Sequence, residues 1–199
     1  MMLPFTAKVF GSISIRLRLW GCLVIVSFLA LSSLGCQQEA TYETISEATL
    51  KPGDVIPAPS EEIVLTILGN LSNPNRGDKL VFDLPTLEKL GLVQYTVPDP
   101  WLQRDVTYTG VFLSDVMKAA TVSDSITGVY VVALDGYNSD IPVADIEDWP
   151  VILATQSDGQ YMTIENSGPT RIIYPYDTYP NITDARNRSV WNIERLEIK

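Results

Sequence analysis

The sequence predicts an α+β fold, built on a strand-dominated mixed sheet with a few short helices. From residue 63 onward, short runs rich in valine, isoleucine, tyrosine and threonine alternate with clusters of glycine, proline, asparagine and aspartate. This pattern is typical of strands joined by turns. Only short stretches between these runs carry apolar residues at helical spacing. Two or three short helices are therefore expected among the strands.

The first expected elements are a hairpin and a short helix. Two β-rich runs, residues 63–69 and 79–84, flank the turn-rich segment NLSNPNRGD, which predicts a hairpin. Asp83 can cap the helix that follows, because its carboxylate can accept backbone N–H groups. Pro85 is tolerated in the first turn of that helix, and Gly91 can end it.

Later segments continue the pattern of strands and turns. Residues 106–120, VTYTGVFLSDVMKAA, predict a strand that passes into a helix with one buried face. Asp135-Gly136 and Asp158-Gly159 each predict a tight turn between two strands, because aspartate and glycine tolerate the backbone angles that such turns need. Further strands are expected over residues 92–97 and, with one irregularity, over residues 189–199.

The first 35 residues predict an export signal and are excluded from the fold. Lys8, Arg16 and Arg18 precede an uncharged apolar stretch that ends at Gly35-Cys36. This ending resembles the lipobox of bacterial lipoproteins, so Cys36 is the expected lipidation site. The alternatives are an ordinary cleaved signal and a retained transmembrane anchor, since the uncharged residues 19–38 are long enough to cross a bilayer.

After the signal, the sequence predicts a tether followed by one domain. Prolines and charges in residues 36–61 oppose a packed core and favour a flexible tether. Residues 62–199 are expected to form the domain. With the lipid on Cys36, the chain would be a membrane-anchored lipoprotein that faces the periplasm. Gln37 after the cysteine favours the outer membrane over the inner membrane.

Composition excludes several classes of function. Loss of the signal removes three of the 14 basic residues and none of the 24 acidic ones, which leaves a net charge of about −13. Because such a surface repels nucleic acid, no nucleic-acid partner is expected. Histidine is absent, and the two cysteines, Cys22 and Cys36, precede the domain. We therefore assign no catalytic residue and no metal ligand.

Four segments follow one another in an order that identifies a family. They are YTGVFLSDVMKAA, VVALDGYNSDIPVAD, WPVILATQSDGQYMTIENSGPTRIIYP and SVWNIERLEI. This order resembles the molybdopterin-binding domain of the sulfite oxidase family. The resemblance covers residues 62–198. It implies the α+β fold of that family, with a cofactor pocket at the ends of several strands.

The functional residues of that family carry over only in part. The family's metal-ligating cysteine comes from a loop that here reads VQYTVPDPWLQRDVTY and has no cysteine. The family's His-Gly-x-Pro-x-Arg element, which helps to hold the pterin phosphate, is matched by the segment from Asn166 to Arg171. Of that element, only Pro169 and Arg171 are retained. A lysine that faces the cofactor in the family is replaced by Val190.

Three residues are candidates for the remnant of a cofactor-binding pocket: Asn166, Arg171 and Arg188. Arg171 has two interpretations. It either contacts an anion beside the aromatic segment YPYDTYP, or it forms an ion pair with a carboxylate that anchors its turn to the sheet. Trp101, Trp149 and Trp191 are expected in the core or at its rim. Asp145 is expected on a solvated face.

The sequence favours a non-catalytic, sensory binding module with no bound cofactor. Without a thiolate and a cluster of cations, a molybdenum centre lacks its ligand and the charges that compensate the pterin phosphate. The expected partner is a small anion, or a periplasmic or membrane signalling protein. The alternative is an active molybdopterin-dependent oxidoreductase. In that case Asp99 or Asp105 would ligate the metal, or a partner would complete the site.

Overall fold

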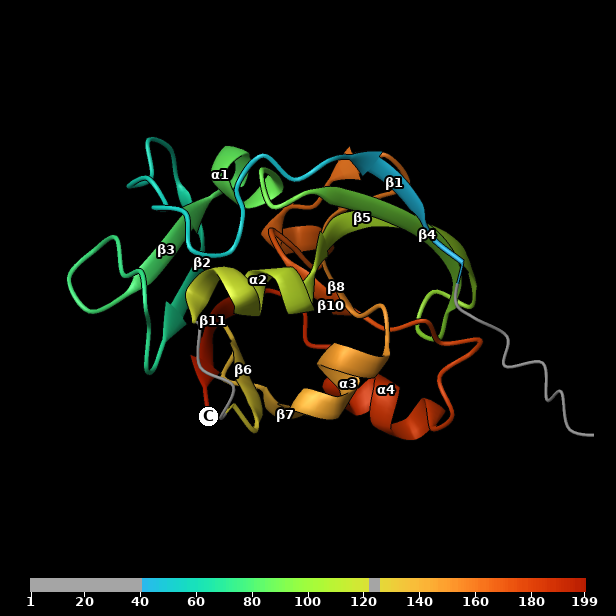
Figure 1. Ribbon diagram of the computed structural model, residues 1–199. Helices are drawn as coiled ribbons and strands as arrows, with labels where there is room; N and C mark the ends of the chain where they lie inside the picture. Colours follow the sequence, from blue (N-terminus) through green and yellow to red (C-terminus); the bar gives the residue numbers. More distant parts are fainter. Residues whose placement is uncertain (1–40, 122–125) are drawn as a thin grey trace, which may run out of the picture. The chain divides into compact units, whose positions relative to one another are not determined.

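Two β-sheets and four short helices make up the computed structural model, which describes residues 41–121 and 126–199 (Figure 1). The strands are β1 (Glu43–Ser46), β2 (Ile63–Leu68), β3 (Leu80–Asp83), β4 (Leu92–Asp99), β5 (Arg104–Phe112), β6 (Gly128–Ala133), β7 (Asn138–Pro142), β8 (Ile152–Ser157), β9 (Gln160–Tyr161), β10 (Arg171–Ile173) and β11 (Ile193–Ile198). The helices are α1 (Leu84–Glu88), α2 (Leu113–Ala120), α3 (Val143–Asp148) and α4 (Ile182–Arg188), with a 3-10 turn at Ile164–Asn166. The predicted α+β class, with strands dominant, is confirmed.

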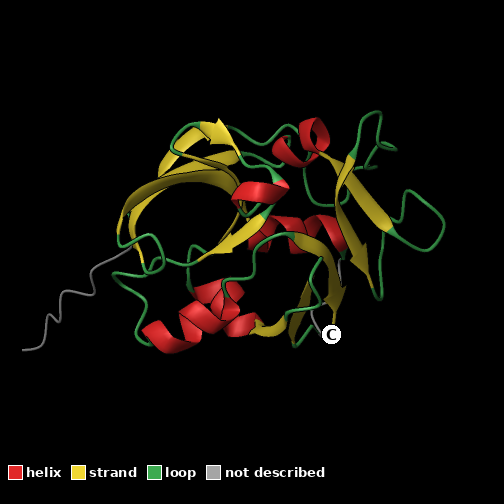
Figure 2. Ribbon diagram, turned by 180° about the vertical axis from the view of Figure 1, so that it is seen from behind, coloured by secondary structure: helices red, strands yellow, loops and turns green. Residues whose placement is uncertain are grey.

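One sheet is antiparallel and the other is mixed. The first has the strand order β1-β4-β5-β8-β10, with β9 also paired to β8, and all its pairs are antiparallel. The second has the order β3-β2-β11-β6-β7, in which only β2 and β11 run parallel. Helix α2 packs against β5 and α3. Helices α3 and α4 lie side by side in both views (Figures 1 and 2).

The predicted hairpin and helix at the start of the domain are confirmed. Strands β2 and β3 pair in antiparallel fashion. Asp83 caps helix α1, because its Oδ1 accepts the backbone N–H of Thr86 at 3.0 Å. Its Oδ2 accepts the N–H groups of Ser60 and Glu61 at 2.7 and 3.1 Å. Gly91 follows the helix with a φ of +99°, as expected for a residue that ends one.

The two predicted Asp-Gly turns also form. Asp158 and Gly159 have φ values of 50° and 75° and connect β8 to β9. Gly136, with a φ of 87°, lies in the turn between β6 and β7. The last strand begins at Ile193, four residues later than expected. The preceding Trp191 pairs instead with Arg171 of β10 through an isolated bridge.

The segment before β2 differs from the expected tether over residues 36–61. Strand β1 pairs with β4, and the side chain of Ile56 is only 3% exposed. The backbone N–H groups of Thr49 and Leu50 donate to the carbonyl of Lys89 at 2.8 and 2.9 Å. These long-range partners hold the proline-rich segment against the domain, so residues 43–61 are part of the fold.

The expected export signal and Cys36 lie outside the described residues. Within residues 41–121 and 126–199, none of the helices has the length and apolar character needed to cross a bilayer.

Candidate functional site

Arg171, the first residue of β10, forms a buried ion pair with Asp99 at the end of β4. Its Nη2 lies 3.1 Å from Oδ2 of Asp99, and the two side chains are 5% and 0% exposed. Its Nη1 donates to the hydroxyl of Tyr108 at 2.9 Å. That hydroxyl donates to Oδ2 of Asp99 at 2.7 Å. The three groups thus form a closed network, which offsets the cost of burying two charges.

Three aromatic rings surround the guanidinium of Arg171. Its Cζ lies 4.9 Å from the ring centroid of Trp101, 5.3 Å from that of Trp191 and 5.4 Å from that of Tyr108. The two indoles meet edge to face, with centroids 5.2 Å apart. Rings at this distance attract a cation through their quadrupoles. The ion-pair interpretation of Arg171 is confirmed, although the pair is buried and not on the surface.

Asp99 organises the turn between β4 and β5. Its Oδ1 accepts the backbone N–H groups of Trp101 and Leu102 at 2.9 and 2.8 Å, a local turn that aspartate favours. Burial alone raises the pKa of this carboxyl. Hydrogen bonds from Leu102 and Tyr108 and the charge of Arg171 outweigh burial, so the pKa is lowered below its ordinary value. Both oxygens of the carboxylate therefore have protein partners.

Asn166 and Arg171 line the same cavity. The side chain of Asn166, however, has a structural role in a 3-10 turn. Asn166 Oδ1 accepts the backbone N–H of Thr163 and so caps the turn. Both candidates line a cavity of about 450 Å³, called here the Arg171 cavity, together with Trp101 and Trp191. The structure thus brings two of the three predicted site residues together.

Arg188, the third candidate, belongs to a separate network between α3 and α4. Its Nη1 lies 2.8 Å from Oδ2 of Asp145 and donates to the hydroxyl of Tyr179 at 2.9 Å. Tyr174 and Tyr179 donate to the same carboxylate at 2.7 and 2.9 Å. The expected solvated position of Asp145 is wrong, because these partners leave the residue as a whole, backbone included, only 7% exposed. Arg188 lines neither the Arg171 cavity nor the larger cavity beside it.

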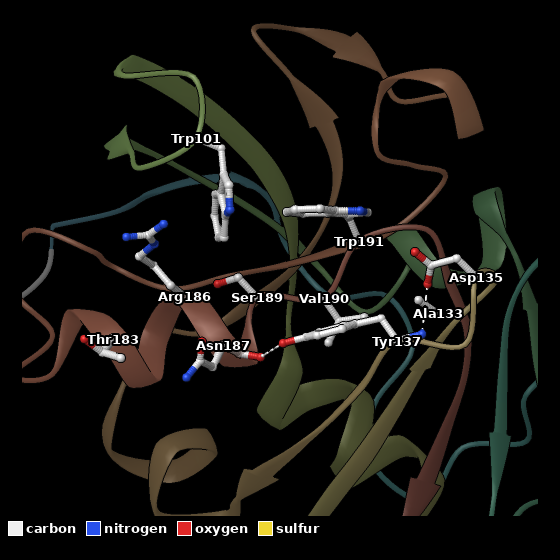
Figure 3. A pocket seen from close by; sticks show the side chains of 10 residues that line it. All are labelled: Trp101, Ala133, Asp135, Tyr137, Thr183, Arg186, Asn187, Ser189, Val190 and Trp191. Carbon is white, nitrogen blue, oxygen red and sulfur yellow. Dashed lines mark hydrogen bonds between the residues drawn. The ribbon is translucent and has the colours of Figure 1, made fainter.

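The larger cavity has a volume of about 490 Å³ and is called here the Arg186 cavity (Figure 3). Its lining consists of Trp101, Ala133, Asp135, Tyr137, Thr183, Arg186, Asn187, Ser189, Val190 and Trp191. It shares the two tryptophans with the Arg171 cavity. Arg186 is exposed, and its Cζ lies 5.9 Å from the ring centroid of Trp101. The guanidinium makes no ion pair with any described residue.

Figure 3 shows how the side chains surround the Arg186 cavity. Trp191 lies on one side and Tyr137 on the opposite side, while Arg186 and Asp135 lie at its two ends. Tyr137 is held by two hydrogen bonds: its hydroxyl donates to the carbonyl of Asn187 at 2.7 Å, and its N–H donates to Oδ1 of Asp135 at 2.9 Å. The cavity therefore offers aromatic walls, one cation and one carboxylate.

Sequence reasoning missed Tyr137 and Asp135 as lining residues. The Asp135-Gly136 signal predicted the turn between β6 and β7, but the turn gave no indication of what lies opposite it. In the described ranges, no three side chains of aspartate, glutamate or cysteine cluster as metal ligands would.

Comparisons with known proteins agree with the fold. Residues 93–179 match the family described as the oxidoreductase molybdopterin binding domain. Among solved structures, the chain is similar to the sulfane dehydrogenase SoxCD from Paracoccus pantotrophus, with a TM-score of 0.52 and 21% sequence identity. The alignment covers 68% of this chain and 37% of that chain. At this identity the likeness shows a common fold. Among curated proteins, none matches the sequence.

Proposed function

Residues 93–179 match the oxidoreductase molybdopterin binding domain family, and from this premise we propose that the chain is a binding module and not a molybdenum enzyme. The domain binds a small anion or a signalling protein, and its ligand lies next to the remnant of the cofactor pocket. The chain is exported, carries a lipid on Cys36 and faces the periplasm from the outer membrane. The buried pair between Arg171 and Asp99 is the observation that carries the proposal.

The residues around Arg171 do not fit a molybdenum cofactor. By the sequence resemblance, Arg171 stands at the position that helps to hold the pterin phosphate. Here its charge is compensated by Asp99 at 3.1 Å, and its planar face is covered by Trp101. An anionic phosphate at this position would place a second negative charge beside the carboxylate. The domain also has no cysteine, so a thiolate ligand is missing as well.

Neither carboxylate considered as an alternative metal ligand is suited to that role. Asp99 is buried and accepts hydrogen bonds on both carboxylate oxygens. A metal would have to displace these partners at a large cost in free energy. Asp105 is exposed and lines neither cavity. The family match nevertheless favours one remaining alternative, an oxidoreductase whose site is completed by a partner chain.

Elemental analysis of the full chain separates the two functions. The protein is purified from a bacterial culture that also produces a known molybdopterin enzyme with its cofactor bound. Molybdenum content and the fluorescence of acid-released pterin are measured for this protein and for that enzyme. We expect far less than one molybdenum atom per chain. Stoichiometric molybdenum and pterin in this chain would refute the proposal.

Fatty-acid labelling of the intact chain and of Cys36→Ser tests the anchor, and we expect the label to be lost in the variant.

A further inference from the structure

We propose that the Arg186 cavity binds a flat aromatic acid of about two fused rings. The anionic group of the ligand contacts Arg186, and a hydroxyl or amino group at its far end donates to Asp135. This inference rests on the proposed function as a binding module and names the class of ligand.

The shape and lining of the cavity favour a flat ligand. Trp191 and Tyr137 lie on opposite sides of the cavity (Figure 3), and aromatic rings pack well against other ring systems. The volume of about 490 Å³ lies in the range of about 300–1,000 Å³ typical of small-molecule sites. Tyr137 is held at both ends by Asn187 and Asp135, so its ring is positioned before a ligand arrives.

The charges favour an acid with a donor at the opposite end. Arg171, Arg188 and Arg104 all form ion pairs with aspartates. Arg186 differs from them, since it forms no ion pair within the described residues and borders the cavity. At the other end, only Oδ1 of Asp135 accepts a hydrogen bond from a described residue. Its second oxygen is available to a donor on the ligand.

The negative net charge of the chain makes Arg186 necessary for binding an anionic ligand. At a net charge of −10, the protein as a whole repels anions. An organic anion therefore binds only where a local cation and apolar contact outweigh that repulsion. The Arg186 cavity supplies both through the guanidinium and the two tryptophans that border it.

The probe for this site is 6-hydroxy-2-naphthoate, which carries an acid and a hydroxyl at opposite ends of two fused rings. Its binding to the full chain is followed by the fluorescence of the probe and by calorimetry. Two further compounds serve as controls: 2-naphthol lacks the acid, and 2-naphthoate lacks the donor. We expect the probe to bind at least about tenfold more tightly than 2-naphthol, as one charge-assisted contact implies.

Three variants at exposed positions assign the contacts. Arg186→Gln should weaken binding of the probe at least about tenfold. Arg76→Gln removes the same charge from an exposed position outside the cavity and should leave the affinity for the probe unchanged. Asp135→Asn should weaken binding of the probe but not binding of 2-naphthoate, which has no donor for Asp135. The melting temperature of each variant is measured to verify that it folds.

The outcomes distinguish this inference from the proposed function. Absence of probe binding, or equal affinity in the Arg186→Gln and Arg76→Gln variants, overturns the inference while a molybdenum-free protein still supports a binding module. Stoichiometric molybdenum overturns the proposed function and the inference together. Binding that depends on Arg186 but not on Asp135 also overturns the inference as stated, because the site then recognises only the acid.

Discussion

Nη2 of Arg171 lies 3.1 Å from Oδ2 of Asp99, and the two side chains are 5% and 0% exposed. The pair joins the start of β10 to the end of β4, and the hydroxyl of Tyr108 contacts both partners. The arginine that resembles a phosphate-binding residue is thus compensated by a carboxylate of the same chain. This arrangement makes the ion pair a structural element whose removal can be measured.

Asp99→Asn is expected to lower the free energy of unfolding by about 3–5 kcal/mol, because it leaves the guanidinium of Arg171 buried without a counter-charge. Asparagine retains an oxygen that can accept the N–H groups of the β4–β5 turn, so the loss reports mainly the charge. Urea denaturation measures it. The matched control is Arg104→Gln, which breaks an exposed pair with Asp158 and should lower stability far less, because water screens an exposed ion pair. Equal losses in both variants would contradict a buried, energetically important pair.

The cap of helix α1 makes stability depend on acid. Burial of the Asp83 carboxyl raises its pKa, but hydrogen bonds from Thr86, Ser60 and Glu61 outweigh burial and lower the pKa from 3.8 to about 2. A carboxyl with a lower pKa in the folded state stabilises the fold above its unfolded pKa. This contribution is lost as the pH falls from about 4 to about 2.

The variant Asp83→Asn tests this dependence. It should be less stable than the parent chain at pH 7, because the charge-assisted bonds to Ser60 and Glu61 are weakened. Between pH 4 and pH 2 its melting temperature should fall less steeply than that of the parent. Asp99 and Asp158 also have lowered pKa values and titrate in both proteins, so the difference between the two curves isolates Asp83. Parallel curves would show that Asp83 does not contribute.

Arg188 and Arg186 are expected to have opposite roles although both lie on α4. Arg188→Gln breaks a partly buried pair with Asp145, whose side chains are 22% and 11% exposed, and should lower the free energy of unfolding by about 1–3 kcal/mol. Affinity for 6-hydroxy-2-naphthoate should stay within about twofold, because Arg188 does not line the Arg186 cavity. Arg186→Gln should show the reverse, with weaker binding and little change in stability. If only Arg188→Gln weakened binding of the probe, Arg188 and not Arg186 would be the ligand-binding residue.

The parts of the fold that the sequence predicted depend on neighbouring residues. Asp83 caps a helix that begins at the next residue. Asp158 and Gly159 form a turn because these two adjacent residues both adopt positive φ angles. In each case a short stretch contains both the chemical group and its partner. Alternation of apolar residues likewise identified most strands, since burial of one face is a local pattern.

The candidate site could not be predicted to the same extent, because its contacts join distant parts of the chain. Asp99 and Arg171 are 72 positions apart, and Tyr108 and Arg171 are 63 apart. Neither pairing follows from spacing or periodicity. Family resemblance identified Arg171, but it could not reveal that a carboxylate from β4 had become its partner. The wrong expectation for Asp145 has the same origin, since its partners come from residues 174–188.

Close packing around Gly168 gives a last prediction about the segment that carries Asn166 and Arg171. A Cβ on Gly168 would lie 2.4 Å from Cβ of Met162 and 2.6 Å from its carbonyl oxygen. Because these atoms belong to or adjoin the backbone, Gly168→Ala must shift the segment and should cost at least about 2 kcal/mol. At Gly77, where an added Cβ meets nothing within 4 Å and φ is +65°, the same change should cost only about 1 kcal/mol of backbone strain. Urea denaturation compares the two variants, and a Gly168→Ala variant as stable as Gly77→Ala would mean that this segment is not closely packed against Met162.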